Sequence, residues 1–414
     1  MSKVAVIIIN YNTYQKTKKC IDILRENTTV DYHIYLLDNG SKNESLHLAV
    51  IIAVVMLFVY LLYYKGVGLP NTDKPTKILL TAIALMVVCS AVRSQQSYGQ
   101  SILMGLRPQR YYLILLAYFP IKNVILSRKG GFKWVINVML GVGIAAATIY
   151  SIQYLVFPFK FLVVGNDYRF GQVRLRFNEV GTLFSMFYAY YKIIKRPCWK
   201  WGFVFAIHLF YYIVVIKGRS GLIVLALVLT ILLILFNRQK WKAAVSIFAV
   251  AVVLLYAPIP IVDQYLEGFN EGIDSYQNQT DVRYKGQQFY IQSVTEDTPS
   301  MIFGKGYVNI QSSSAVRISR AKDFYIVDNG YFGLAYFYGF FGVACNILMC
   351  LYISISTYKL QRKLDFGIEC GVGSGLYLIA ASILVPYMLY YYTYCLLAVE
   401  LALIDRMKHF ERGM

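Results

Sequence analysis

Long apolar runs, separated by short polar segments, dominate the chain after residue 45. Most of them approach the roughly 20 residues that an α-helix needs to cross a bilayer. The last run contains Pro386, which breaks a helix, so we expect two short spans there. The pattern predicts an all-α polytopic membrane protein with about ten or eleven transmembrane helices. The runs are residues 46–64, 78–92, 111–126, 135–157, 180–194, 199–216, 222–236, 243–262, 331–355 and 371–404.

Short basic clusters without acidic residues occupy every second loop, at residues 128–133, 192–200, 238–242 and 359–363. The positive-inside rule assigns these loops to the cytoplasm. The alternate loops are therefore expected on the outer face of the membrane. They are residues 158–177, 218–221 and the long, charge-balanced segment 263–327, which we predict to be a large extracytoplasmic loop.

The composition agrees with a membrane protein: 57% of the residues are hydrophobic and 15% are charged, with a mean hydropathy of +0.50. These values exclude an ordinary soluble globular protein. The net charge of +19 could indicate nucleic-acid binding, but the basic residues lie between apolar runs, as membrane topology requires, so we expect no nucleic-acid partner. The seven cysteines show no CxxC spacing, which predicts neither a zinc site nor a disulfide framework.

Residues 1–45 follow another pattern. A β-branched run at 4–10, helical spacing over 14–26 and a second run at 34–38 predict a short βαβ unit. The segments VAVIIINYN and IYLLDNGS resemble the opening of a family 2 glycosyltransferase of the GT-A fold, in which they would cradle a nucleotide. The rest of that fold is absent, because the membrane part begins at residue 46. We interpret residues 1–45 as a truncated fragment joined to a membrane domain of residues 46–414.

The side of the membrane on which this fragment lies follows from the number of spans. Three apolar runs precede Arg128, so residues 1–45 would lie outside the cell. A cytoplasmic position requires one run to be re-entrant, or a first span to have been lost where the fragment was joined. Parity favours the joined fragment.

Arg219 is the most conspicuous cation of the outer face, since positive-inside topology does not explain it. It lies in the short predicted turn GRSG between two spans, where the glycines allow a ligand to approach the backbone closely. An arginine that snorkels to the interface is the structural alternative. We favour a phosphate-binding role, because a guanidinium can hold a phosphate through two hydrogen bonds.

A second outer-face cluster consists of Arg169, Arg174 and Arg176. The two nearby acids, Asp167 and Glu179, cannot pair with all three arginines. An anionic substrate or a lipid is therefore the expected partner, and a basic collar that binds lipid headgroups is nearly as good an explanation.

The long loop carries Arg283 and Lys285 at the head of a helix-like stretch that ends at Gly304 and Gly306. These two cations are candidates for substrate binding.

Asp328 and Asn329 lie where the chain re-enters the membrane. A cap of the following helix and a cap that also acts as catalytic base are equally good explanations of Asp328.

In residues 46–414, the segments RFNEVG, GRSG, GKGY and DNGYFGLAYFYGFFG, in this order, resemble the O-antigen polymerase and ligase superfamily (Wzy type, with the WaaL-type ligases as relatives). Each segment is short, and their order and shared outer face carry the resemblance. Ligases of the family typically have a histidine at the re-entry, where this chain has Asp328 and Asn329. This departure favours a polymerase.

The resemblance implies a metal-independent glycosyltransferase of the GT-C type, without a cofactor, in the bacterial inner membrane. It would polymerise undecaprenyl-diphosphate-linked oligosaccharide repeat units at the outer face. Arg219 and Arg283 would bind the diphosphate, assisted by Lys285 or by the cluster at 169–176. Asp328, or another acid of the long loop, would accept the proton of the attacking hydroxyl. Membrane lipids and a protein that sets chain length are the other expected partners.

Two alternatives remain. One is a ligase that transfers the glycan to a lipid acceptor. The other is a flippase for lipid-linked oligosaccharides, which would need charged or broken helices at the midplane and usually an internal repeat. The sequence shows no repeat, and its ionisable residues lie mostly in loops.

Overall fold

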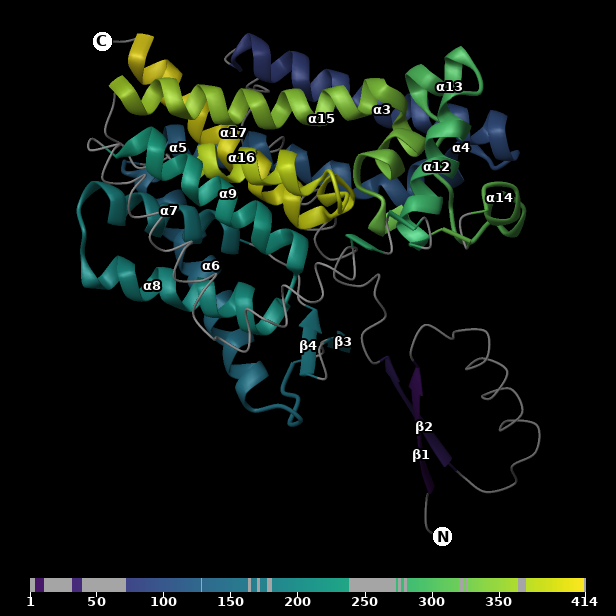
Figure 1. The fold of residues 1–414 in the computed structure, drawn as a ribbon, viewed down its shortest axis with the longest axis horizontal. Helices are drawn as coiled ribbons and strands as arrows, with labels where there is room; N and C mark the ends of the chain where they lie inside the picture. Colours follow the sequence, from purple (N-terminus) through teal and green to yellow (C-terminus); the bar gives the residue numbers. More distant parts are fainter. Residues whose placement is uncertain are drawn as a thin grey trace.

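The computed structural model is a bundle of helices with two small two-stranded sheets (Figure 1). The predicted apolar runs 46–64 and 243–262 and the predicted helix at 14–26 lie outside the described residues. The structure describes residues 4–10, 32–38, 72–127, 129–162, 165–169, 172–176, 181–237, 273–274, 277–278, 281–320, 323–324, 326–363 and 370–412.

Four helical segments of the described chain are long and apolar enough to cross a membrane, and each coincides with a predicted run. The protein is therefore a polytopic membrane protein, as the sequence predicts. The four segments are α3 (Lys74–Tyr98), α6 (Gly131–Leu155), α15 (Gly330–Lys363), and α8 (Trp199–Phe210) with its π-helical continuation η2 (Tyr211–Ile216).

Other predicted spans form shorter helices, which include α7 (Thr182–Lys195), α9 (Arg219–Phe236) and α16 (Cys370–Ala381). The 12 residues of α16 extend only about 18 Å, less than the roughly 30 Å of a hydrocarbon core. Within the described residues, four helical segments meet the length and apolarity of a span, and the total of ten or eleven stays a prediction, because the runs 46–64 and 243–262 lie outside those residues. Apolar composition alone does not tell where a run is interrupted.

The last apolar run is divided where Pro386 predicts a break. Helix α16 is followed by the short 3₁₀ helix η4 (Tyr387–Leu389), with Pro386 at its N-cap, and then by α17 (Tyr391–Arg412). Because proline has no backbone N–H and clashes with the preceding turn, a continuous helix cannot form there. The prediction of two segments is confirmed.

The run from Ile102 to Ser127 stays helical throughout but changes its winding. It comprises α4 (Ile102–Leu106), the 3₁₀ helix η1 (Arg107–Ala117) and α5 (Tyr118–Ser127). The residues at both junctions, Leu106 and Tyr118, keep right-handed helical backbone angles. At about 1.5 Å per α-helical and 2.0 Å per 3₁₀ residue, the run is about 44 Å long, enough to cross a bilayer.

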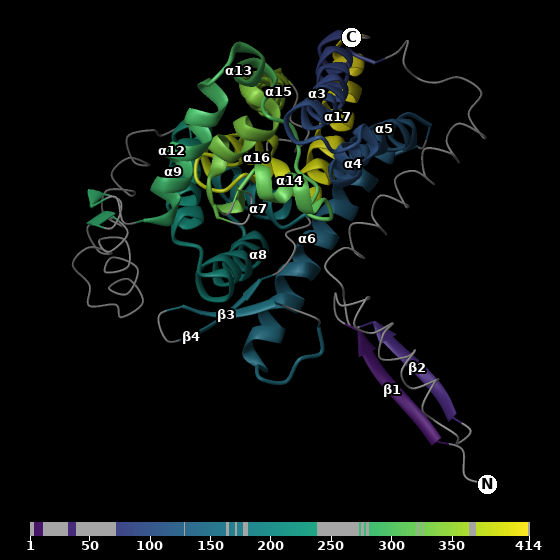
Figure 2. The ribbon, with the colours of Figure 1, turned by 90° about the vertical axis from the view of Figure 1, so that its right-hand side faces the viewer.

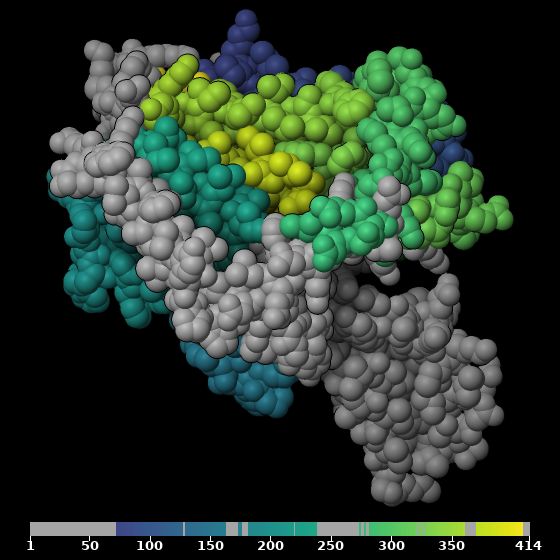
Figure 3. Space-filling model, in the orientation of Figure 1, coloured from purple at the N-terminus to yellow at the C-terminus, as the bar shows by residue number. Residues whose placement is uncertain are grey.

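The bundle has two distinct ends. At one, which we call the loop end, the helices of the 263–327 segment lie together: α12 (Val282–Thr295), α13 (Thr298–Phe303) and α14 (Ser313–Ile318). Figure 3 shows α12 and α13 side by side on the surface next to α15. The other, which we call the basic end, contains the start of α3 and the ends of α15 and α17 (Figure 1).

A buried polar network closes the basic end. Lys122 of α5 forms an ion pair with Asp405 of α17 at 2.6 Å, and both side chains are almost fully buried. The backbone N–H of Asp73 also donates to Asp405, at 3.0 Å, and the hydroxyl of Tyr118 donates to it as well. Lys408 forms an ion pair with Asp73 at 2.8 Å. The network joins α3, α5 and α17.

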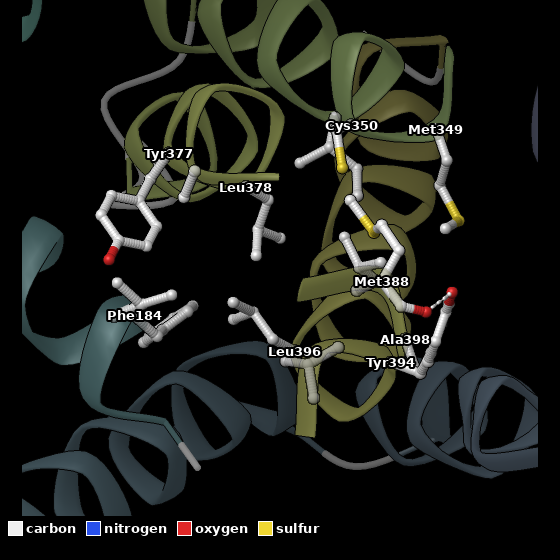
Figure 4. Close-up of a cluster of buried hydrophobic side chains, with 14 of the residues drawn as sticks. Phe184, Met349, Cys350, Tyr377, Leu378, Met388, Tyr394, Leu396 and Ala398 are labelled. Carbon is white, nitrogen blue, oxygen red and sulfur yellow. Dashed lines mark hydrogen bonds between the residues drawn. The ribbon is translucent and has the colours of Figure 1, made fainter. Parts of the chain in front are cut away.

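Apolar and aromatic side chains from α7, α15, α16 and α17 fill the space between the ends (Figure 4). Phe184, Tyr377 and Leu396 are buried in this cluster. The buried hydroxyl of Tyr394 donates to the carbonyl of Met388 at 2.7 Å, so the aromatic core keeps this polar group satisfied.

The two sheets are separate from each other in the chain and in their pairing. Strands β1 (Val4–Asn10) and β2 (Tyr32–Asp38) pair in parallel, at the positions where the sequence predicts strands. Strands β3 (Gly165–Arg169) and β4 (Gln172–Arg176) form an antiparallel hairpin. This hairpin lies in residues 158–177, which were predicted to form a loop.

Candidate functional site

The turn before α9 is displaced by two residues from the predicted GRSG turn. Lys217 has left-handed backbone angles (φ 51°, ψ 38°), Gly218 is the N-cap, and Arg219 is already the first residue of α9. The carbonyl of Gly218 accepts from Leu222 at 2.9 Å, as expected for an N-cap. The turn therefore consists of Lys217 and Gly218, because the π-helical winding of η2 ends one residue before Lys217.

Lys217 is a buried cation at this turn, with 2% of its surface exposed. Its ammonium group donates to the hydroxyl of Tyr154 and to the carbonyl of Val173, each at 3.1 Å. It thereby joins the end of α6, the β3–β4 hairpin and the start of α9. Lys217 is not among the predicted site residues, although it shares the signal of Arg219, a cation at a predicted outer-face turn.

The hairpin brings Arg174 to the same turn. The Nε group of Arg174 donates to the carbonyl of Ile216, the last residue of η2, at 2.6 Å. In the hairpin register Arg174 is opposite Asp167, Arg169 is opposite Gln172, and Arg176 is opposite Gly165. The side chains of Arg169, Arg176 and Arg219 lie outside the described part of the structure. Arg174 thus stabilises the end of η2. This structural role was not predicted, since the sequence indicated only an anion-binding role.

The start of α9 is close to α16. A side chain at Gly221 would meet the hydroxyl of Tyr377 at 3.2 Å. Beyond the end of α16, the backbone of Ile383 closely approaches Gly330, the first residue of α15. The hydroxyl of Tyr331 donates to the carbonyl of Ile379 at 2.8 Å. The start of α9 and the re-entry are therefore linked through α16 and the segment that follows it.

The re-entry is in turn packed against α12. Asn329 is buried, and a Cβ atom at Gly286 of α12 would lie 2.8 Å from the Asn329 side chain. Arg283 precedes Gly286 by three residues, so the two residues are neighbours on one face of α12. This contact brings the head of α12 to the point where the chain re-enters the bundle.

Asp328 does not cap α15. It is the last residue of the 3₁₀ turn η3 (Ile326–Asp328), and Asn329 precedes the helix, with its carbonyl accepting from Phe332 at 3.0 Å. The 3₁₀ turn shifts the capping position by one residue. The half-buried Asp328 carboxylate makes no hydrogen bond or ion pair with the residues that the structure describes.

Arg283 and Lys285 are exposed on α12. The backbone N–H of Arg283 donates to the N-cap residue Asp281 at 2.6 Å, whereas its guanidinium has no partner among the described residues. The cap fixes the start of α12. The two cations are therefore held on an ordered helix and are open to a ligand.

Two other described acids of the long loop, Asp297 and Glu296, have structural partners. Asp297 caps α13 by accepting from the Ser300 N–H at 2.7 Å. This bond, the hydroxyl of Ser300 and the nearby Lys305 lower the pKa of Asp297 to about 2. Glu296 is 2.6 Å from the ammonium of Lys305. Asp328 is therefore a better candidate for a base than either of these two acids.

The glycines of the GKGY segment serve packing. Gly304, which ends α13 at φ +77°, lies against Gly339, where α15 has a non-helical residue at φ +66°. A Cβ atom at Gly339 would lie 2.1 Å from the carbonyl oxygen of Ile302. Only glycine fits both the positive φ and this backbone contact. The pair fixes α13 against the kink in α15.

The structure thus places the head of α12 against the re-entry with Asn329 at the loop end, and it connects the start of α9 to the re-entry only indirectly, through α16. Arg174 is at the turn before α9. No group of three or more His, Cys, Asp or Glu residues that could hold a metal ion occurs among the described residues.

Comparison with known protein families identifies one match in this part of the chain. Residues 203–347 match the family model described as O-Antigen ligase. A comparison with curated proteins finds no match. The glycosyltransferase resemblance of residues 1–45 gains no support. The matched segment extends from α8 to α15 and contains Lys217, Arg219, Arg283 and the re-entry. It supports the resemblance of residues 203–347 to the O-antigen ligase and polymerase superfamily.

Proposed function

We propose that the chain is a membrane glycosyltransferase that lengthens a glycan carried on undecaprenyl diphosphate, at the outer face of the bacterial inner membrane. The observation that carries this proposal is the contact between Gly286 and Asn329, which joins the helix bearing Arg283 to the re-entry bearing Asp328. The family match over residues 203–347 supports the reaction class.

The chemistry requires two functions from the protein. Negative charge builds up on the departing diphosphate, and arginines at its position stabilise the transition state. In this proposal Arg219 and Arg283 supply that stabilisation, with Lys285 and the hairpin arginines Arg169, Arg174 and Arg176 attracting the substrate.

The acceptor sugar must also lose a proton as its hydroxyl attacks the anomeric carbon. Asp328 takes that proton in our proposal, since its carboxylate has no structural partner in the described residues. Asn329, fixed against α12, positions the residue beside it.

The test is complementation of a strain that lacks its polysaccharide polymerase, read as a ladder of chain lengths on a gel. We expect Arg219→Ala, Arg283→Ala and Asp328→Asn to remove the ladder while the proteins stay in the membrane. Arg317→Ala is the matched control, because Arg317 is an exposed arginine at the loop end. Normal long chains in the Arg219 and Arg283 variants would contradict the proposal.

A ligase is the second candidate, and the description of the matched family favours it. The two activities leave different products when they are lost. A defective polymerase leaves single repeat units on the outer side, whereas a defective ligase leaves long chains on the lipid carrier without transfer to the acceptor lipid. Accumulation on the cytoplasmic side would instead indicate a flippase.

A further inference from the structure

The 3₁₀ helix η1 sorts its side chains into three columns. With three residues per turn, residues i and i+3 lie directly above one another. The columns 109–112–115 and 111–114 are buried: Gln109, Tyr112, Leu115, Tyr111 and Ile114 all belong to them. Two sides of η1 are therefore packed inside the bundle, and one column faces outward.

The outward column reads Arg107, Arg110, Leu113 and Leu116. Arg107 is exposed, Leu113 is 41% exposed, and Arg110 and Leu116 are partly exposed. Three residues of 3₁₀ helix rise about 6 Å, so the two arginines lie about one turn apart on the same line. A regular α-helix would turn them about 60° away from each other. Along this column, the side chains of Arg107 and Arg110 are therefore neighbours, and they are followed by those of Leu113 and Leu116.

No acidic residue of the described chain balances this charge. Arg107 donates from Nη1 to the amide oxygen of Gln311 at 3.1 Å. The Nε group of Arg110 is buried and has no hydrogen-bond partner. Snorkelling would place the polar atoms of an arginine in water, but this donor is shielded from solvent. The two Nη groups of Arg110 are not buried and make no hydrogen bond with the described residues, so a ligand with acceptor oxygens can bind them.

The surroundings of the column are apolar. Ile102, Leu103 and Met104 of α4 are 40%, 76% and 40% exposed. They precede Arg107 in a helical run long enough to cross the membrane, whose first part packs on the membrane-spanning α3. Such exposed side chains suit lipid tails. The surface therefore offers cations and an apolar lining together.

We propose that Arg107 and Arg110 bind the phosphate of an anionic bilayer phospholipid, with an acyl chain along Leu113 and Leu116. Phosphate oxygens accept from both guanidinium groups, and the net negative charge of the lipid offsets the stacked cations. Helix η1 packs against α4, α5 and α17. In Figure 2, α4 lies on the opposite side of the loop end from α9 and α12. The lipid site is thus separate from the proposed transfer site and does not depend on that proposal.

The test uses the full chain in detergent, titrated with dioleoylphosphatidylglycerol and, separately, dioleoylphosphatidylcholine, with bound lipid counted by native mass spectrometry. The parent should prefer the anionic lipid. At about a fivefold effect for each arginine, the double variant Arg107→Gln/Arg110→Gln should bind phosphatidylglycerol about 30-fold more weakly. The single variant Arg107→Gln, at an exposed position that poses little risk to folding, should lose about fivefold. The control pair Arg196→Gln/Lys200→Gln removes the same charge from exposed positions where α7 ends and α8 begins, away from η1.

Unchanged binding by the control pair, together with the loss in the η1 variants, would support the site. Three results would overturn it: η1 variants that bind like the parent, equal binding of the two lipids by the parent, or equal losses in the control pair. Displacement of phosphatidylglycerol by undecaprenyl phosphate at equimolar amounts would also overturn it, since the site would then serve the carrier lipid.

Discussion

The two ends of the bundle treat charge in opposite ways. At the basic end, Asp73, Lys122, Asp405 and Lys408 pair with one another, and buried hydroxyls complete the network. At the loop end, the side chains of Arg283 and Asp328 have no polar partner among the described residues. A buried charge is tolerated only when it is paired, so the first group belongs to the scaffold. The second group is available to a substrate. The candidate site thus differs from the scaffold in having exposed or half-buried charges without partners.

The largest effect should come from opening the basic-end network. Asp405→Ala leaves the buried ammonium of Lys122 without its carboxylate and should lower the free energy of unfolding by about 3–5 kcal/mol. Denaturation of the purified protein in detergent measures the change. The double variant Lys122→Met/Asp405→Leu, which removes both charges, should recover much of the loss. A single variant as stable as the parent would show that the network is not a scaffold.

At the loop end, a substitution should lower the transfer activity without lowering the stability of the fold. Arg283→Ala should lower glycan transfer about 10²–10³-fold, as the loss of one transition-state donor does. The free energy of unfolding should change by less than about 0.5 kcal/mol, because the side chain is exposed and unpaired. A transfer assay and a denaturation curve on the same preparation separate the two. If Arg283→Ala destabilised the protein as much as Asp405→Ala, the charges at the two ends would not differ in role.

Glu400 of α17 is a buried carboxylate that belongs to neither group of charges. It is 2% exposed, and neither carboxylate oxygen has a hydrogen-bond partner among the described residues, since the nearby Ser374 hydroxyl donates to Cys370 instead. Burial of an unpartnered polar group is unfavourable, so Glu400→Met should be neutral or should stabilise by on the order of 1 kcal/mol. The same denaturation assay applies. Loss of transfer activity in this variant, with the fold intact, would place Glu400 among the functional charges.

The smallest effect concerns the cap of α13. Asp297→Ala should cost about 1 kcal/mol, whereas Asp297→Asn, which retains a capping oxygen, should cost less. The folded-state pKa of Asp297 is lowered to about 2, so its contribution is complete above the ordinary pKa near 4 and is lost as the pH falls towards 2. The difference between parent and Asp297→Ala in thermal unfolding should therefore shrink below pH 4. A constant difference down to pH 2 would contradict the assigned role.

The apolar pattern of the sequence was sufficient for the membrane-embedded helices. The runs at 78–92, 135–157, 199–216 and 331–355 became α3, α6, α8 with η2, and α15, because about 20 apolar residues have few other stable conformations in a bilayer. The break at Pro386 was predicted for an equally local reason. The type of helix was not predicted. Nothing in the pattern indicated that residues 107–117 form a 3₁₀ helix, or that residues 211–216 form a π-helix.

The sequence by itself determined the membrane class, the break at Pro386 and the presence of unexplained cations such as Arg219 and Arg283. It could not decide which of these cations have partners, since pairing depends on contacts between residues far apart in the chain. Tertiary structure assigned Arg174 to the end of η2, buried Lys217 beside Tyr154, and placed Gly286 against Asn329. The sequence shows which residues are charged, but only the packing of the folded chain decides which of them have partners. Paired charges belong to the scaffold, and unpaired charges mark the candidate site.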